Sequence, residues 1–170
     1  MNKQTMLLAG VCALALTACG QQADEPVAED VQMGKTEEVI QVDCPVADES
    51  GSIEIAPGLR AKIVKNGYGR AAVEGDYADT NVWLWLYDAA AEDKHGPFIW
   101  ESGNEVFQFQ LGAGQVIKGW DMGVPCMLEG ETRELVVAGD LAYGPAGRGE
   151  IPPNATLIFT IELLELTSPD

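Results

Sequence analysis

Basic side chains are scarce in this sequence. Its 170 residues include 10 lysines and arginines against 27 aspartates and glutamates, which gives a formal net charge of −17. A surface of that sign repels phosphate backbones and anionic head groups. The composition therefore argues against nucleic acid as a partner and against membrane attachment by charge.

Long apolar runs and histidine are also lacking. The apolar run at residues 6–16 is shorter than the ~20 residues that cross a bilayer as a helix. No transmembrane segment is predicted after it. The only histidine, His95, lies in a polar segment, so the sequence offers no set of metal ligands. We expect neither a metal nor a cofactor.

The first 19 residues have the order of a secretory signal. Lys3 precedes the apolar run, and small residues then lead to Cys19. The end of this stretch, LTAC, resembles the lipobox of bacterial lipoproteins, which implies cleavage before Cys19 and a lipid on its thiol. Gly20 after the cysteine resembles sorting to the periplasmic face of the outer membrane in a bacterial cell envelope. The alternative is an ordinary signal peptide that contains a cysteine.

Four cysteines are present, and two of them are accounted for by this signal. Cys12 leaves with residues 1–18, and Cys19 becomes the lipid anchor. Cys44 and Cys126 remain in an oxidising compartment, where a disulfide can persist. Two readings stay open: the pair forms a disulfide that ties the incoming segment to the domain, or both thiols are free.

The rest of the chain divides at about residue 53. Residues 19–52 are acidic and poor in large apolar side chains, which is typical of a flexible tether. From residue 53 to 167, alternating apolar residues predict strands at 59–64, 81–88, 106–112, 133–139 and 155–166. One short helix is predicted at 116–127, limited by Gly123 and Pro125. The pattern predicts an α+β domain with an antiparallel sheet and one helix on its face.

Three blocks of this domain resemble one enzyme family. The segments FQFQLGAGQVIKGWDMGV, LAYGPAGRG and IPPNATLIFTIELLEL stand in the order and spacing of the FKBP-type peptidyl-prolyl cis-trans isomerases. The resemblance covers residues 106–166 almost without a break and extends more loosely back to residue 55. It implies a twisted antiparallel sheet wrapped around one short helix. It also implies rotation of X–Pro bonds during the folding of envelope proteins, with no metal or cofactor.

The resemblance also implies roles for individual residues. Trp120 would form the pocket floor under the proline ring, and the backbone N–H of Ile117 would bind a substrate carbonyl. The Tyr143 hydroxyl would hold the rotating amide carbonyl. Glu101 would supply the catalytic carboxylate of the family. The pocket walls and rim would be formed by Val82, Trp100, Phe107, Val116, Ile151 and Phe159.

Two positions depart from the family pattern. When WLYD at residues 85–88 is aligned with the same block of the family pattern, Val82 takes the position of the family's pocket tyrosine. An alignment shifted by one residue would put Trp83 there. The family's phenylalanine-aspartate-serine block becomes WES at residues 100–102. The segment before Phe107 lacks the arginine that often pairs with this carboxylate. We therefore expect an isomerase with reduced activity.

The expected partners follow from the same resemblance. Proline-containing polypeptides would be the clients, and a macrolide of the rapamycin type would be an inhibitor. The tether is too short and polar to form the helical region through which some relatives dimerise, so we expect a monomer. The alternative function is a chaperone-like module that binds proline-containing segments in the same pocket without useful turnover.

Overall fold

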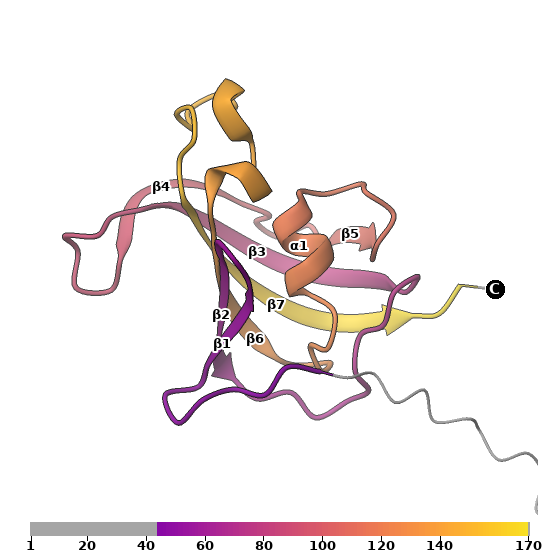
Figure 1. Ribbon diagram of the computed structural model, residues 1–170. Helices are drawn as coiled ribbons and strands as arrows, with labels where there is room; N and C mark the ends of the chain where they lie inside the picture. Colours follow the sequence, from indigo (N-terminus) through magenta and orange to yellow (C-terminus); the bar gives the residue numbers. More distant parts are fainter. Residues whose placement is uncertain (1–43, 170) are drawn as a thin grey trace, which may run out of the picture. The chain divides into compact units, whose positions relative to one another are not determined.

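The computed structural model describes residues 44–169, which form one antiparallel sheet with a single short α-helix (Figure 1). The strand order is β1-β2-β6-β7-β3-β4, and β5 pairs with the first part of β3. The elements are β1 (Ser52–Ala56), β2 (Leu59–Lys65), β3 (Tyr77–Tyr87), β4 (His95–Glu101), β5 (Phe107–Gln110), α1 (Lys118–Gly123), β6 (Thr132–Val137), the 3-10 turns η1 (Gly139–Leu141) and η2 (Gly144–Ala146), and β7 (Leu157–Thr167).

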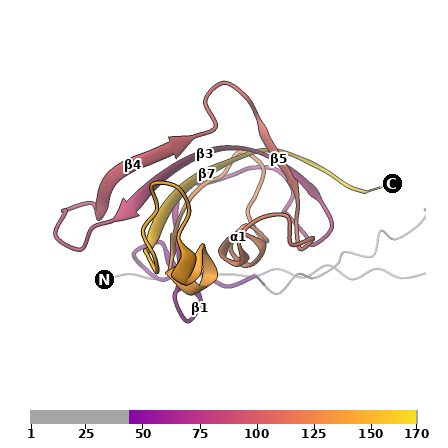
Figure 2. The same ribbon diagram turned by 90° about the horizontal axis from the view of Figure 1, so that it is seen from above.

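The sheet curves around α1, and the core lies between the helix and the concave face (Figure 2). Alternate side chains of the longest predicted strand enter this core, as the sequence pattern predicts. Leu157, Phe159, Ile161 and Leu163 are all buried. Burial stabilises each of these side chains by about 1.5–3 kcal/mol relative to exposure. The predicted α+β architecture is confirmed.

Helix α1 is shorter than the helix predicted at residues 116–127. Ile117 has an extended backbone, with φ −64° and ψ 151°, and the helix ends at Gly123, two residues before Pro125. Two glycines let the helix lie directly on β6. A Cβ on Gly119 would collide with Val137, and one on Gly123 would lie 2.8 Å from a methyl of Leu135.

The chain before β2 contains a strand that the alternation did not identify. Strand β1 pairs antiparallel with β2, and the turn between them contains Gly58 at φ +83°. A short strand at the sheet edge, with only one paired side, has little room for a periodic signal. The sequence pattern therefore did not predict the β1–β2 hairpin.

A disulfide joins Cys44 to Cys126, with 5.6 Å between their Cα atoms. The sequence left the pairing open. Ala47, three residues after Cys44, packs against the hydrophobic core. Residues 44–51, assigned to the tether from composition, are thus covalently attached to the domain just beyond α1.

A buried ion pair lies under the end of α1. Arg133 and Glu131 are each 3% exposed, and Nε of the arginine donates to Oε1 of Glu131 at 2.7 Å. The guanidinium also donates to the carbonyls of Gly123 at 2.9 Å and Cys126 at 3.3 Å. Glu131 in turn accepts the N–H of Leu128 at 2.9 Å. This network satisfies the carbonyl groups where the helix ends.

A second ion pair fixes the entry to β3. Arg70 donates to both carboxylate oxygens of Asp76, at 2.6 and 3.1 Å, and Asp76 also accepts the N–H of Val73 at 3.0 Å. The hydrogen bond to Asp76 raises the pKa of Arg70.

No helix within residues 44–169 is long and apolar enough to cross a membrane.

Candidate active site

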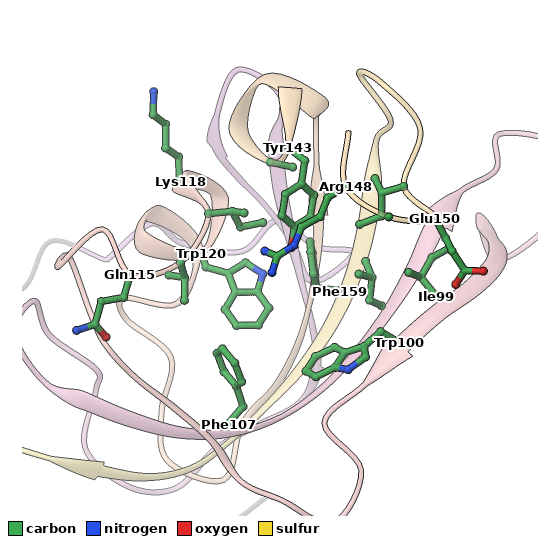
Figure 3. A pocket seen from close by; sticks show the side chains of 16 residues that line it. Ile99, Trp100, Phe107, Gln115, Lys118, Trp120, Tyr143, Arg148, Glu150 and Phe159 are labelled. Carbon is green, nitrogen blue, oxygen red and sulfur yellow. The ribbon is translucent and has the colours of Figure 1, made fainter. Parts of the chain in front are cut away.

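A cavity of about 910 Å³ lies on the concave side of the sheet (Figure 3). Its walls come from β3, β4, β5, β7, the start of α1 and the loop between η1 and β7. It is lined by Leu84, Ile99, Trp100, Phe107, Gln115, Val116, Ile117, Lys118, Trp120, Ala142, Tyr143, Arg148, Gly149, Glu150, Ile151 and Phe159. All the predicted pocket residues except Val82 and Glu101 are among them.

Trp120 is the floor of this cavity. Its indole is 5% exposed and packs against three phenylalanine rings. The ring centroids of Phe159, Phe109 and Phe107 lie 5.2, 5.4 and 5.7 Å away. The contacts with Phe107 and Phe159 are edge-on, a preferred aromatic geometry. The phenylalanines therefore fix the indole plane, and the cavity remains open above it.

The indole N–H of Trp120 is buried and has no hydrogen-bond partner among the described residues. A buried donor without a partner costs about 1–3 kcal/mol. A phenylalanine at this position would avoid that cost. The tryptophan is therefore not the residue that stability alone would select, which favours a role for its ring surface in the cavity.

Two residues of the cavity lining, Ile117 and Tyr143, carry hydrogen-bond donors that have no acceptor among the described residues. The N–H of Ile117 stands just before α1, and no acceptor for it lies within residues 44–169. The Tyr143 hydroxyl also makes no hydrogen bond within that range, although its ring is half-buried in the cavity wall. Both groups are available to bind carbonyl oxygens of a bound peptide.

The loop after Tyr143 is held by its own backbone. Arg148 and Ile151 exchange two hydrogen bonds, of 3.0 and 2.9 Å, across a tight turn that contains Gly149 at φ +56°. The N–H of Asn154 donates to the carbonyl of Gly144 at 2.7 Å. These bonds place Ile151, 6% exposed, at the cavity rim where the sequence predicted it.

Val82 does not reach the cavity, which corrects the predicted wall. It is fully buried in the core, and Leu84, two residues further along the same face of β3, lines the cavity instead. Alternation gives both residues the same face but does not say how far along the strand the cavity lies. Trp83, the residue suggested by a one-residue slip, points to the opposite face.

Glu101 also lies outside the cavity. Trp100 pairs with Leu84 on β3 and lines the cavity, whereas Glu101 pairs with Trp83 and is exposed. Trp83 lies on the face of β3 opposite to that of Leu84, so Glu101, which is paired with Trp83, points away from the pocket. The carboxylate assigned to the reaction is therefore absent from the cavity lining.

Several lining residues were not predicted as site residues. Ile99 and Leu84 come from the β3–β4 hairpin, and Gln115 and Lys118 flank the predicted segment around Ile117. The proximity in sequence of Arg148, Gly149 and Glu150 to Ile151 was the signal that could have identified the loop residues. Ile99 had the same signal, because it is next to Trp100, whereas Leu84 could be found only from the strand register.

The arrangement suits binding and distortion of an apolar group better than covalent chemistry. Within residues 44–169, no group of three histidine, cysteine, aspartate or glutamate side chains is placed to hold a metal ion. The lining is mostly apolar and aromatic, and two of its residues carry donors without an acceptor in the described part of the chain. Such a site can desolvate a peptide bond and hold its carbonyl group.

Comparisons with known proteins agree with this geometry. A family model described as FKBP-type peptidyl-prolyl cis-trans isomerase matches residues 68–164. A protein named FK506-binding protein 1 from Dictyostelium discoideum is 59% identical over 108 residues, which cover 63% of this chain and 96% of that protein. A protein named FK506-binding protein from Neisseria meningitidis serogroup B is 37% identical over 110 residues, covering 64% and 96%.

A solved structure has the same architecture. The crystal structure of a peptidyl-prolyl cis-trans isomerase from Pseudomonas syringae pv. tomato matches with a TM-score of 0.58 and 28% sequence identity. The match covers 69% of this chain and 82% of that chain. The curved sheet around one short helix is thus shared with a protein of known structure.

Proposed function

The chain belongs to the FKBP-type peptidyl-prolyl cis-trans isomerases, and we propose that X–Pro bonds rotate in the cavity above Trp120. The reaction is the exchange of a proline peptide bond between its cis and trans forms. Its barrier is about 20 kcal/mol, because amide resonance must be broken. The twisted transition state is less delocalised and less polar than the planar amide. An apolar, water-poor cavity therefore favours it.

Each part of the cavity has a task in this proposal. The proline ring rests on the indole of Trp120, with Phe107 and Phe159 at its sides. The N–H of Ile117 holds a substrate carbonyl, and the Tyr143 hydroxyl holds the carbonyl that turns. Donors that are fixed in advance need not reorganise during the rotation.

One observation carries this proposal: the aromatic floor belongs to the same cavity as two donors that have no acceptor among the described residues. The test is cis–trans exchange in a short X–Pro peptide with the chain from residue 20 onward. We expect an exchange rate above the uncatalysed rate. Binding of the peptide with no acceleration would instead support the chaperone-like module, for which the loss of Glu101 from the cavity is the favouring observation.

The same cavity is proposed to bind macrolides. The relatives from Dictyostelium and Neisseria carry the name FK506-binding protein. The floor and side walls that would receive such a ligand are present here, with Leu84 completing the wall. We propose a monomeric enzyme that FK506 or rapamycin inhibits by occupying the space of the substrate proline.

We further propose that the enzyme is lipid-anchored at Cys19 in a bacterial envelope, where it acts on proline-containing envelope proteins. The order of basic residue, apolar run, small residues and cysteine supports this proposal. The residues concerned lie outside the described range. Expressed in a bacterium supplied with labelled palmitate, the natural chain should take up label and sediment with the outer membrane. The Cys19→Ser variant should do neither, and an unlabelled natural chain would refute the anchor.

A further inference from the structure

One positive charge is directed into the cavity of this acidic protein. Lys118, Arg148 and Glu150 are the charged residues of the lining. Figure 3 shows Arg148 directed toward Tyr143 and Trp120, whereas Lys118 points away from the cavity and Glu150 points to its outer edge beside Ile99. The local charge over the floor is therefore positive, although the formal net charge of the chain is −17.

Arg148 is held in this position from two directions. Its backbone is fixed by the two hydrogen bonds with Ile151. Its guanidinium carbon lies 5.4 Å from the centroid of the Tyr143 ring, within the range of a cation–π contact. Within residues 44–169 the guanidinium forms no ion pair with the protein's own carboxylates, so its donors are free for a ligand.

The position of Arg148 beside Tyr143 determines which part of a bound substrate would lie near the guanidinium. The carbonyl that turns belongs to the residue before proline, and the proposed function places it at the Tyr143 hydroxyl. The side chain of that residue branches from the atom next to the carbonyl. It therefore comes within reach of the guanidinium stacked on the Tyr143 ring.

We infer that Arg148 is a specificity-determining residue that favours substrates with aspartate or glutamate immediately before proline. The inference depends on the isomerase function proposed for this cavity. A guanidinium can donate two parallel hydrogen bonds to a carboxylate, which a point charge such as lysine cannot reproduce. The general repulsion between an acidic peptide and an acidic protein acts over a longer range and is screened by salt.

The experiment compares peptides that differ only in the residue before proline. For the natural domain near neutral pH and 0.15 M salt, we expect kcat/KM for a Glu-Pro peptide to exceed that for the isosteric Gln-Pro peptide by about threefold, the scale of an exposed ion pair. The Lys-Pro peptide should be the poorest of the three. The preference should reside mainly in KM, because the contact is made before and during rotation alike.

Two variants that change the net charge equally separate a local contact from the overall field. R148Q should bring the Glu:Gln ratio to one or below, whereas K118Q should leave the ratio near that of the natural chain. R148K should retain only part of the preference for the Glu-Pro peptide. Equal loss in R148Q and K118Q would overturn the inference in favour of a general charge effect, as would a Glu:Gln ratio of one in the natural chain. Absence of exchange with every peptide would refute the isomerase function itself.

Discussion

Replacing Trp120 with leucine is expected to lower kcat/KM for X–Pro exchange at least about tenfold, equivalent to about 1.4 kcal/mol of transition-state stabilisation. Leucine is apolar but has no flat surface, and it leaves the rings of Phe107 and Phe159 without the edge-on partner that orients them. A collapsed floor no longer supports the proline ring while the bond turns. The measurement is the exchange rate of a proline peptide by NMR line shape or magnetisation transfer.

The control for this prediction is Trp120→Phe. It keeps an aromatic floor and removes the buried indole N–H that has no partner, so its activity should lie between those of the natural chain and the leucine variant. Unfolding by urea must be recorded for both, because Trp120 is also part of the core. A folded leucine variant with natural activity would show that the indole floor has no part in the reaction.

The variant Tyr143→Phe tests the contribution of the hydroxyl donor independently of the aromatic floor formed by Trp120. The hydroxyl makes no hydrogen bond within the described residues, so its loss should leave the free energy of unfolding almost unchanged. If the hydroxyl holds the turning carbonyl, kcat should fall about fivefold to tenfold, the scale of one hydrogen bond made in the transition state. An unchanged kcat would remove this donor from the proposed mechanism.

Most of the site residues that the family resemblance implied, and that the cavity contains, come from continuous segments. Val116, Ile117 and Trp120 lie within one short stretch, and Tyr143 and Ile151 lie at the two ends of one loop. Within such segments the spacing of residues in sequence fixes their spacing in space. The long alternation of β7 likewise placed Phe159 on the core face.

The errors arise where two strands must be aligned. Val82 and Leu84 share a face of β3, so alternation alone cannot choose between them. The choice depends on which residues of β3 lie opposite β4. The pairing of these two strands shifts register between Leu84 and Trp85. The same register decides the position of Glu101. It pairs with Trp83, on the face of β3 opposite to that of Leu84, and therefore points away from the cavity.

The disulfide could not be derived from the sequence because 82 residues separate Cys44 from Cys126. The compartment inferred from the signal permits a bridge, but only the path of the chain brings the two Cα atoms close enough. The segment before β1 carries no strong periodic pattern that would fix this path. The structure places Cys44 beside the end of α1, where Cys126 follows the helix.

The buried arginine at the end of α1 gives the largest expected effect on stability. Arg133→Met should reduce the free energy of unfolding by about 3–5 kcal/mol, because it leaves the Glu131 carboxylate buried without its partner. It also removes the donor to the carbonyls of Gly123 and Cys126. The measurement is urea unfolding of the oxidised protein near neutral pH, with the m-value compared between variants.

Two further variants distinguish the ion pair from loss of packing. Arg60→Met removes an exposed arginine from β2 and should change stability by less than about 0.5 kcal/mol. Arg133→Met combined with Glu131→Leu removes both charges and should recover part of the loss, because no buried carboxylate is left unpaired. If the double variant is no more stable than Arg133→Met alone, the carbonyl groups after α1, and not Glu131, are the groups that need Arg133. In either case the arginine stabilises the helix end that supports Trp120, so the same variants connect the stability of the fold to the geometry of the cavity floor.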